Sequence, residues 1–567
     1  MRVPGPGASV AFLAVVLGGG LLAAGAVRGG LLSPYDRLSL GLLGGGLVWI
    51  AAASRPGLLR ERPSWSGASP RAMGRLAWLW AALYLLAMGT FVVVRHLRFN
   101  SGGFDLGIQD QVVWNTANGR PFASSIEVTH YFGDHVAPFL AFLAPLLWIW
   151  SDPRALLLAQ TAALATMGPA AYRLAMRRTG SPWASAAVGG AVLLTPALGF
   201  MNRYDLHEVT FAAPLLMWTI VWAEEGRLWP SRIAALLAAS TREEVGLVVG
   251  LTALVLLWRK RWGREAWIWA VGGGLWSVTA LFAVLPHFRD GFPSDTLRRY
   301  AYLGGSPGEM LSTLVRRPLW VLGEIFSKEI RLLYLFQLLL PMAGRPLLRP
   351  VLLLPIIPPL VHNLLSTNLS QVSIYFQYTA TMIPFLIWAA VETLPAPGER
   401  RSGGALAAAV AGILLATGVA NVSDPALLAR VGHPHAEVHG WEKWVPTGAF
   451  EDLAGRIPEG QSVLATDAFV PHLSHRRRIG VFRGSLEAPP AQWILLSISN
   501  RRDKEDPRRT LERIRIWLAG GDYVVAGFRE GLVLLARDGP VDSDAARDLD
   551  RFARGTWGVE GVLPGGS

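Results

Sequence analysis

The residues best suited to chemistry in this 567-residue chain are acids, histidines and one arginine that interrupt long apolar stretches. They form four clusters, at 104–111 with Asp105 and Asp110, at 130–135 with His130 and His135, at 204–208 with Asp205, His207 and Glu208, and at 241–244 with Arg242, Glu243 and Glu244. A carboxylate of this kind can act as general base for a hydroxyl group. An arginine, or a carboxylate-bound divalent cation such as Mg²⁺ or Mn²⁺, can neutralise a leaving phosphate.

Each cluster also has a structural interpretation. Asp105 and Asp110 could cap a helix at a membrane interface, and residues 204–208 could form an ordinary loop. His130 and His135 lie five positions apart, whereas two metal ligands on one helix face lie four apart. The chain has no cysteine, which excludes a thiol nucleophile, thiolate metal sites and disulfides. The sequence therefore requires no cofactor, and any metal ligands stay unassigned.

Composition indicates what must position these clusters. Hydrophobic residues make up 51% of the chain and charged residues only 17%, whereas a soluble domain has about a quarter charged. Residues 422–567 carry 19 Lys and Arg against 20 Asp and Glu, so the basic surplus lies in residues 1–421, with 34 against 21. Retention of Arg and Lys in short cytoplasmic loops explains such a surplus. A multi-pass protein of the cytoplasmic membrane, which does not bind nucleic acid, is the expectation.

The apolar segments predict a mainly α-helical bundle of about 11 to 13 spans, because one span needs about 20 apolar residues. The candidates are 8–27, 38–54, 76–94, 155–175, 183–200, 209–223, 266–286, 331–343, 349–364, 376–394 and 404–421. Basic loops place the N-terminus in the cytoplasm and residues 95–135 outside. Residues 1–75 then form an N-terminal hairpin, and residues 76–421 form the core of the bundle.

Two further apolar segments do not fit simple spans. Residues 136–150 are short and contain Pro138 and Pro145, so we expect them to enter the membrane without crossing it. Residues 233–258 lie between two basic loops and are too few for two full spans. A broken hairpin of two short helices, with residues 241–244 at its apex, accounts for them. Charged residues at such an apex are tolerated where they pair or line a wet cavity.

Residues 422–567 predict a small extracytoplasmic α/β domain. Strands are expected at 462–465, 478–482 and 493–498, a short helix at 469–474, a charged helix at about 507–518, and a hairpin over 523–536. With this topology, all four polar clusters lie on one side of the membrane, below the soluble domain. Such an arrangement suits a membrane active site that takes a lipid-borne substrate and a water-borne acceptor.

The sequence FDLGIQDQVVWN at 104–115, continuing to 119–122, resembles a family of uncharacterised polytopic prokaryotic membrane proteins, catalogued as a domain of unknown function. The segments 135–138, 204–208, 241–244 and 471–476 resemble it as well. That family is similar to the GT-C glycosyltransferases, which take sugars from polyprenyl phosphates and carry a catalytic acid in the first large external loop. The resemblance implies Asp105 as that acid, with Asp110 second.

Together, these observations predict a cell-envelope glycosyltransferase that moves a sugar from a polyprenyl-phosphate donor in the lipid to an unidentified extracytoplasmic acceptor. Asp105 would be the general base, supported by Asp110 and His135, and Arg242 would face the donor phosphate. The expected substrate-binding residues are His135, Asp205, His207, Glu208, Arg242, Glu243 and Glu244. A transporter or lipid flippase, for which broken helices are typical, and a non-catalytic membrane scaffold are the alternatives.

Overall fold

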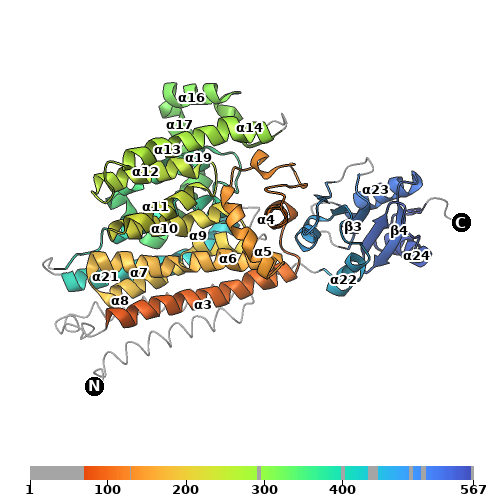
Figure 1. Cartoon of the computed structure of the whole chain (residues 1–567), viewed down its shortest axis with the longest axis horizontal. Helices are drawn as coiled ribbons and strands as arrows, with labels where there is room; N and C mark the ends of the chain where they lie inside the picture. The colour runs from red at the N-terminus through yellow and green to blue at the C-terminus, as the bar shows by residue number, and fades with distance from the viewer. Residues whose placement is uncertain are drawn as a thin grey trace, which may run out of the picture.

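The computed structural model describes residues 69–127, 129–289, 295–397, 402–431, 445–483, 490–499 and 506–563. The expected spans 8–27 and 38–54, residues 55–68 of the expected basic loop 55–75, and Arg400 and Arg401 lie outside these residues. The described part is mainly helical, with one small sheet near the C-terminus. Figure 1 shows the helices packed side by side in one body, with the sheet and its helices at one end of that body, beyond the end of α3.

The helical body contains the following α-helices: α3 Pro70–Leu97, α4 Ile108–Ala117, α5 Ala144–Ile149, α6 Pro153–Ala165, α7 Met167–Thr179, α8 Pro182–Leu193, α9 Pro196–Arg203, α10 Ala212–Glu224, α11 Leu228–Ala239, α12 Val245–Trp258, α13 Ala266–Thr279, α14 Leu285–Phe288, α15 Asp295–Arg298, α16 Pro307–Arg316, α17 Pro318–Phe326, α18 Glu329–Leu339, α19 Ile357–Leu365, α20 Ile383–Val391 and α21 Ser402–Val431.

Within the described residues, two continuous helices are long and apolar enough to cross a membrane, Pro70–Leu97 and Ala266–Phe288. The pair α8 and α9, bent by 42° at its break, makes a third if it counts as one span. The larger predicted number is thus not reproduced by helix length, because many predicted spans are split. Pro355, for example, lies inside the 3₁₀ turn Pro350–Ile356 that precedes α19, and proline cannot donate the backbone hydrogen bond of a continuing α-helix.

The two irregular segments have the expected local form. Residues 136–150 contain a 3₁₀ turn, Pro138–Leu143, and the short helix α5. Residues 233–258 fall in α11 and α12, which are separated by residues 240–244. The polar apex of this hairpin, residues 241–244, is therefore the short turn that connects the two helices.

Basic side chains gather at several loops that the sequence predicts to lie on the same side of the membrane. Glu224, at the end of α10, accepts hydrogen bonds from Arg259 Nε at 2.5 Å and from Arg261 Nε at 2.7 Å. Arg177, at the end of α7, lies 3.6 Å from the same carboxylate. Three helix ends are thus joined by charge, although the orientation of these loops relative to a cytoplasm stays a prediction.

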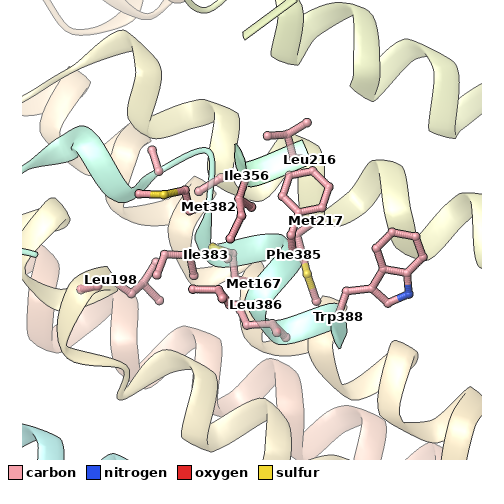
Figure 2. Packing of buried hydrophobic residues seen from close by; sticks show 14 of the residues in the cluster. Met167, Leu198, Leu216, Met217, Ile356, Met382, Ile383, Phe385, Leu386 and Trp388 are labelled. Atoms are coloured by element: carbon pink, nitrogen blue, oxygen red, sulfur yellow. The ribbon is translucent and has the colours of Figure 1, made fainter. Parts of the chain in front are cut away.

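The core of the helical body is built on α20, whose nine residues are all buried. Figure 2 shows Met382, Ile383, Phe385, Leu386 and Trp388 of this region among Met167, Leu198, Leu216, Met217 and Ile356. A short helix that is apolar all round is stable only when other elements cover every face. The surrounding helices therefore hold α20 in place.

The C-terminal part contains a five-stranded sheet in the order β2-β1-β3-β5-β4. Its strands are β1 Val463–Ala465, β2 Ile479–Val481, β3 Trp493–Ser497, β4 Val524–Arg529 and β5 Leu532–Ala536, and its helices are α22 Thr447–Gly455, α23 Pro507–Ala519 and α24 Ser543–Phe552. The first three strands are parallel, and β5 pairs antiparallel with β3 and β4. The expected strands, charged helix and hairpin are confirmed with bounds that differ by at most one residue. The short element expected at 469–474 is a 3₁₀ helix, Asp467–His472.

Candidate active site

Asp105 lies in a single π-helical turn, Gly103–Gly107, between the end of α3 and the start of α4. Its Oδ2 accepts a hydrogen bond from the Tyr204 hydroxyl at 2.9 Å, and its Oδ1 lies 3.3 Å from His207 Nε2. The rings of Tyr204 and His207 stack with their centroids 5.3 Å apart. The Asp105 side chain is 26% exposed, so a carboxylate held by two ring side chains remains open to a substrate.

Asp205 connects the first and third clusters from a buried position. Its Oδ1 accepts from the Arg95 guanidinium near the end of α3, and its Oδ2 accepts from Gly102 N at 2.8 Å. Gln160 fixes the same segment, because its Nε2 donates to Asp205 O at 2.8 Å and its Oε1 accepts from His207 N at 3.0 Å. Burial raises the pKa of Asp205 and the nearby Asp105 charge adds to this rise, which the Arg95 guanidinium opposes.

Three carboxylates surround Gly102. A Cβ atom at Gly102 would lie 3.1 Å from Asp105 Oδ2 and 3.8 Å from Oδ2 of both Asp205 and Asp467. Asp467 belongs to the C-terminal part and was not predicted as a site residue. Its position in the sequence could have indicated a binding role. It follows β1 by two residues, and the carboxyl ends of parallel strands commonly carry binding residues.

Glu208 holds the centre of a second, fully buried network. Its Oε1 accepts from Arg242 Nε at 2.6 Å, while its Oε2 accepts from Gln109 Nε2 and, at 3.1 Å, from the Tyr131 hydroxyl. Burial alone raises the pKa of Glu208, but the Arg242 guanidinium lowers it further, to about 2. The Glu208–Arg242 pair is therefore charged on both sides and closed to solvent.

His135 and Glu243 join the second cluster to the hairpin apex. His135 Nδ1 lies 3.0 Å from Glu243 Oε1, and Val136 N donates to Glu243 Oε2 at 2.9 Å. Burial and the Arg242 charge lower the pKa of His135, but the carboxylates of Asp134 and Glu243 outweigh them and raise it to about 9. Glu244, the last of the predicted residues at the apex, is half-buried at the start of α12.

Most of the predicted site residues lie close together in the structure, and one, Asp110, lies apart from them. Asp105, Asp205 and His207 share one set of contacts, and the adjacent Glu208 leads to Arg242, Glu243 and His135. Asp110 is different, because in the described part of the chain its contacts are to Ser474 and His475 of the C-terminal part. Arg95, Gln109, Tyr131 and Asp467 are contact residues that the sequence did not single out.

The oxygen donors at this site are of the type that Mg²⁺ or Mn²⁺ prefers. However, no group of three or more His, Asp or Glu side chains has an arrangement that could hold a metal ion among the residues the structure describes. The three carboxylates around Gly102 thus do not form a ready metal site in this conformation.

Comparison with known proteins gives the class of the chain. The model of a family described as predicted membrane proteins (DUF2079) matches residues 95–534, which include all four polar clusters and most of the C-terminal part. The chain belongs to this family and is a membrane protein. The resemblance noted at 104–115 is thereby confirmed. No curated protein matches.

Two solved structures of ArnT from Cupriavidus metallidurans are similar to the chain. The structure bound to undecaprenyl phosphate is 13% identical, with a TM-score of 0.43, and the similarity covers 80% of this chain and 97% of ArnT. The apo structure is 12% identical, with a TM-score of 0.41, and covers 81% and 98%. At these TM-scores the likeness gives no information on the chemistry of the site.

Proposed function

We propose that the protein is an inverting membrane glycosyltransferase that moves a sugar from a polyprenyl phosphate to an extracytoplasmic hydroxyl acceptor. The observation that carries this proposal is the exposure of Asp105 beside buried partners. Its side chain is 26% exposed, against 1% for Asp205, 0% for Glu208 and 8% for Glu243. A general base must reach the proton that it removes, and Asp105 is the most accessible of these four carboxylates.

In this reaction the Asp105 carboxylate takes the proton of the acceptor hydroxyl as its oxygen attacks the anomeric carbon. The bond from that carbon to the phosphate oxygen breaks, and the polyprenyl phosphate leaves with the electron pair. Tyr204 and His207 fix the two Asp105 oxygens in place. A fixed geometry of this kind supplies a large part of the rate enhancement in enzymes.

The phosphate requires a positively charged side chain nearby, and from the sequence alone Arg242 is the expected one. Because the Arg242 guanidinium is 7% exposed and binds Glu208, we assign it to the wall of the site. Arg299 is the better candidate for the phosphate. It is half-buried, its Nη1 lies 3.3 Å from Gln371 Oε1, and no carboxylate of the described residues forms an ion pair with it.

Arg299 also belongs to a polar group around Gln371. Gln371 Nε2 lies 3.0 Å from His362 Nδ1 and donates to the Tyr300 hydroxyl at 2.8 Å. The rings of Tyr300 and His362 stack with their centroids 5.3 Å apart. In the proposed reaction, the Arg299 guanidinium binds the phosphate of the donor.

The test is donor turnover by the purified protein in lipid nanodiscs, with a panel of polyprenyl-phosphate sugars and mixed hydroxyl acceptors. We expect the native protein and the surface control Asp544→Asn to release polyprenyl phosphate, and Asp105→Asn to be slower by about 10²- to 10⁴-fold. Equal turnover by Asp105→Asn and the native protein would remove Asp105 from the mechanism. Transbilayer movement of the lipid without sugar transfer would instead support the flippase alternative.

A further inference from the structure

A segment of the C-terminal part, residues 467–475, packs against the turn that carries Asp105. Asp467 Oδ1 accepts a hydrogen bond from Gly103 N at 2.8 Å. A Cβ atom at Gly103 would lie 3.0 Å from Val470 Cβ, and one at Gly107 would lie 2.9 Å from Val470 Cγ1. The approach is close enough that the two glycines are needed for it.

The same segment is bound to α4 by a buried carboxylate. Asp110 accepts a hydrogen bond from the Ser474 hydroxyl, and its Oδ2 lies 3.0 Å from His475 Nε2. His475 Nδ1 lies 3.1 Å from Ser151 Oγ, and its ring stacks on Trp114 at 5.8 Å. The Asp110 side chain is fully buried, so a substrate cannot reach it in this arrangement.

A third contact joins the segment to the end of α3. The rings of His96 and His472 stack with their centroids 4.1 Å apart, and Phe99 packs against His472 at 4.2 Å and Phe469 at 5.8 Å. His96 also contacts Ser101 Oγ at 3.2 Å. Residues 467–475 thus touch α3, the π-helical turn and α4, which are the three elements that determine where Asp105 lies.

From these contacts we infer that residues 467–475 position the general base, with Asp110, Asp467 and Val470 as positioning residues rather than catalytic ones. A single π-helical turn is an uncommon conformation that is frequent at functional sites. Two sides of this turn, at Gly103 and Gly107, rest on the C-terminal part. The expected effect of these contacts on turnover rests on the proposed function. Their expected effect on the order of the π-helical turn does not.

The test uses the tight contact between Gly107 and Val470 in the full-length protein in nanodiscs. Gly107→Ala introduces a Cβ atom 2.9 Å from Val470 Cγ1, and Val470→Ala removes that atom. The measurements are hydrogen–deuterium exchange of the backbone amides of residues 102–111, and kcat and KM for the donor. Asp544→Asn, at an exposed carboxylate far along the chain, is the matched control.

We expect Gly107→Ala to speed exchange over residues 102–111 by about tenfold, since overpacking of a close contact lowers the stability of the packed state by an amount of this order. We also expect kcat to fall while KM for the donor stays near the native value. The double variant Gly107→Ala/Val470→Ala should restore slow exchange and kcat, and the control should change neither.

Two results would overturn the inference: unchanged exchange in Gly107→Ala, or a double variant as fast in exchange as the single one. A second arm uses His475→Phe, which keeps a ring against Trp114 but removes the contact to Asp110; native exchange there would exclude the role of Asp110. If no donor is turned over by the native protein while exchange is lost and rescued as expected, the positioning role stands and the glycosyltransferase proposal fails.

Discussion

His207 Nε2 lies 3.3 Å from Asp105 Oδ1, across more than one hundred residues of sequence. The ring is held from behind by its stack on Tyr204, whose hydroxyl binds the other oxygen of the same carboxylate. Each oxygen of the Asp105 carboxylate is therefore in contact with one ring side chain of the same loop, Tyr204 or His207. This relationship fixes the direction of the Asp105 lone pairs.

The His207 contact should matter for rate more than for folding. His207→Phe keeps a ring against Tyr204 but cannot contact the carboxylate. We expect kcat to fall by about tenfold, because the carboxylate loses one of the two contacts that hold it in a reactive position. The measurement is donor turnover beside thermal unfolding, and a parallel loss of thermal stability would point to a structural role instead.

Gly102 should tolerate no side chain without loss of activity. Gly102→Ala places a methyl group 3.1 Å from Asp105 Oδ2, so the carboxylate must shift by a few tenths of an ångström from its position against Tyr204. We expect a lower kcat with little change in the unfolding temperature, measured on the purified protein. Gly119→Ala is a useful contrast, because there φ is +75° but no atom lies within 4 Å; it should affect stability rather than turnover.

The Glu208–Arg242 pair should be a large contributor to stability. Glu208→Gln leaves the buried Arg242 guanidinium without its anion, and removing one partner of a buried pair costs about 3–5 kcal/mol. We expect a clear fall in the unfolding temperature. The double variant Glu208→Gln/Arg242→Met should recover much of it, and a double variant as unstable as the single one would contradict this assignment.

Stability should depend on pH through His135. Its pKa is about 9 in the folded protein, because of Asp134 and Glu243, against 6.5 for an unperturbed histidine. A raised folded-state pKa means that the stabilisation is complete below about pH 6.5 and is lost as the pH rises through 9. Unfolding temperature measured from pH 6 to 10 should show this decline, and His135→Gln should reduce its slope in that window.

Local patterns in the sequence predicted several elements well. The strands at 463–465 and 493–497 and the hairpin over 524–536 follow from short apolar runs bounded by turn residues. The broken hairpin followed from the charged apex at 241–244, because charge and length together left no other arrangement. The number of continuous spans was not predictable in this way, since prolines such as Pro341 and Pro355 lie in 3₁₀ turns that interrupt the apolar segments after α18 and before α19.

The partners within the site depended on contacts between distant residues. No local pattern pairs Arg95 with Asp205 or Gly103 with Asp467. Asp105 lies in the π-helical turn, whereas Asp110 lies in α4 and contacts Ser474 and His475. Asp110 is buried because the face of α4 that carries it packs against the C-terminal part.

The Gly103–Asp467 hydrogen bond joins residues 364 positions apart, and this separation has a consequence for biogenesis. During synthesis the turn with Asp105 leaves the ribosome long before the strand that ends near Asp467. The contacts that complete this turn therefore cannot form until the segment around Asp467 has also been made. The turn that carries Asp105 thus reaches its final conformation only late in the synthesis of the chain.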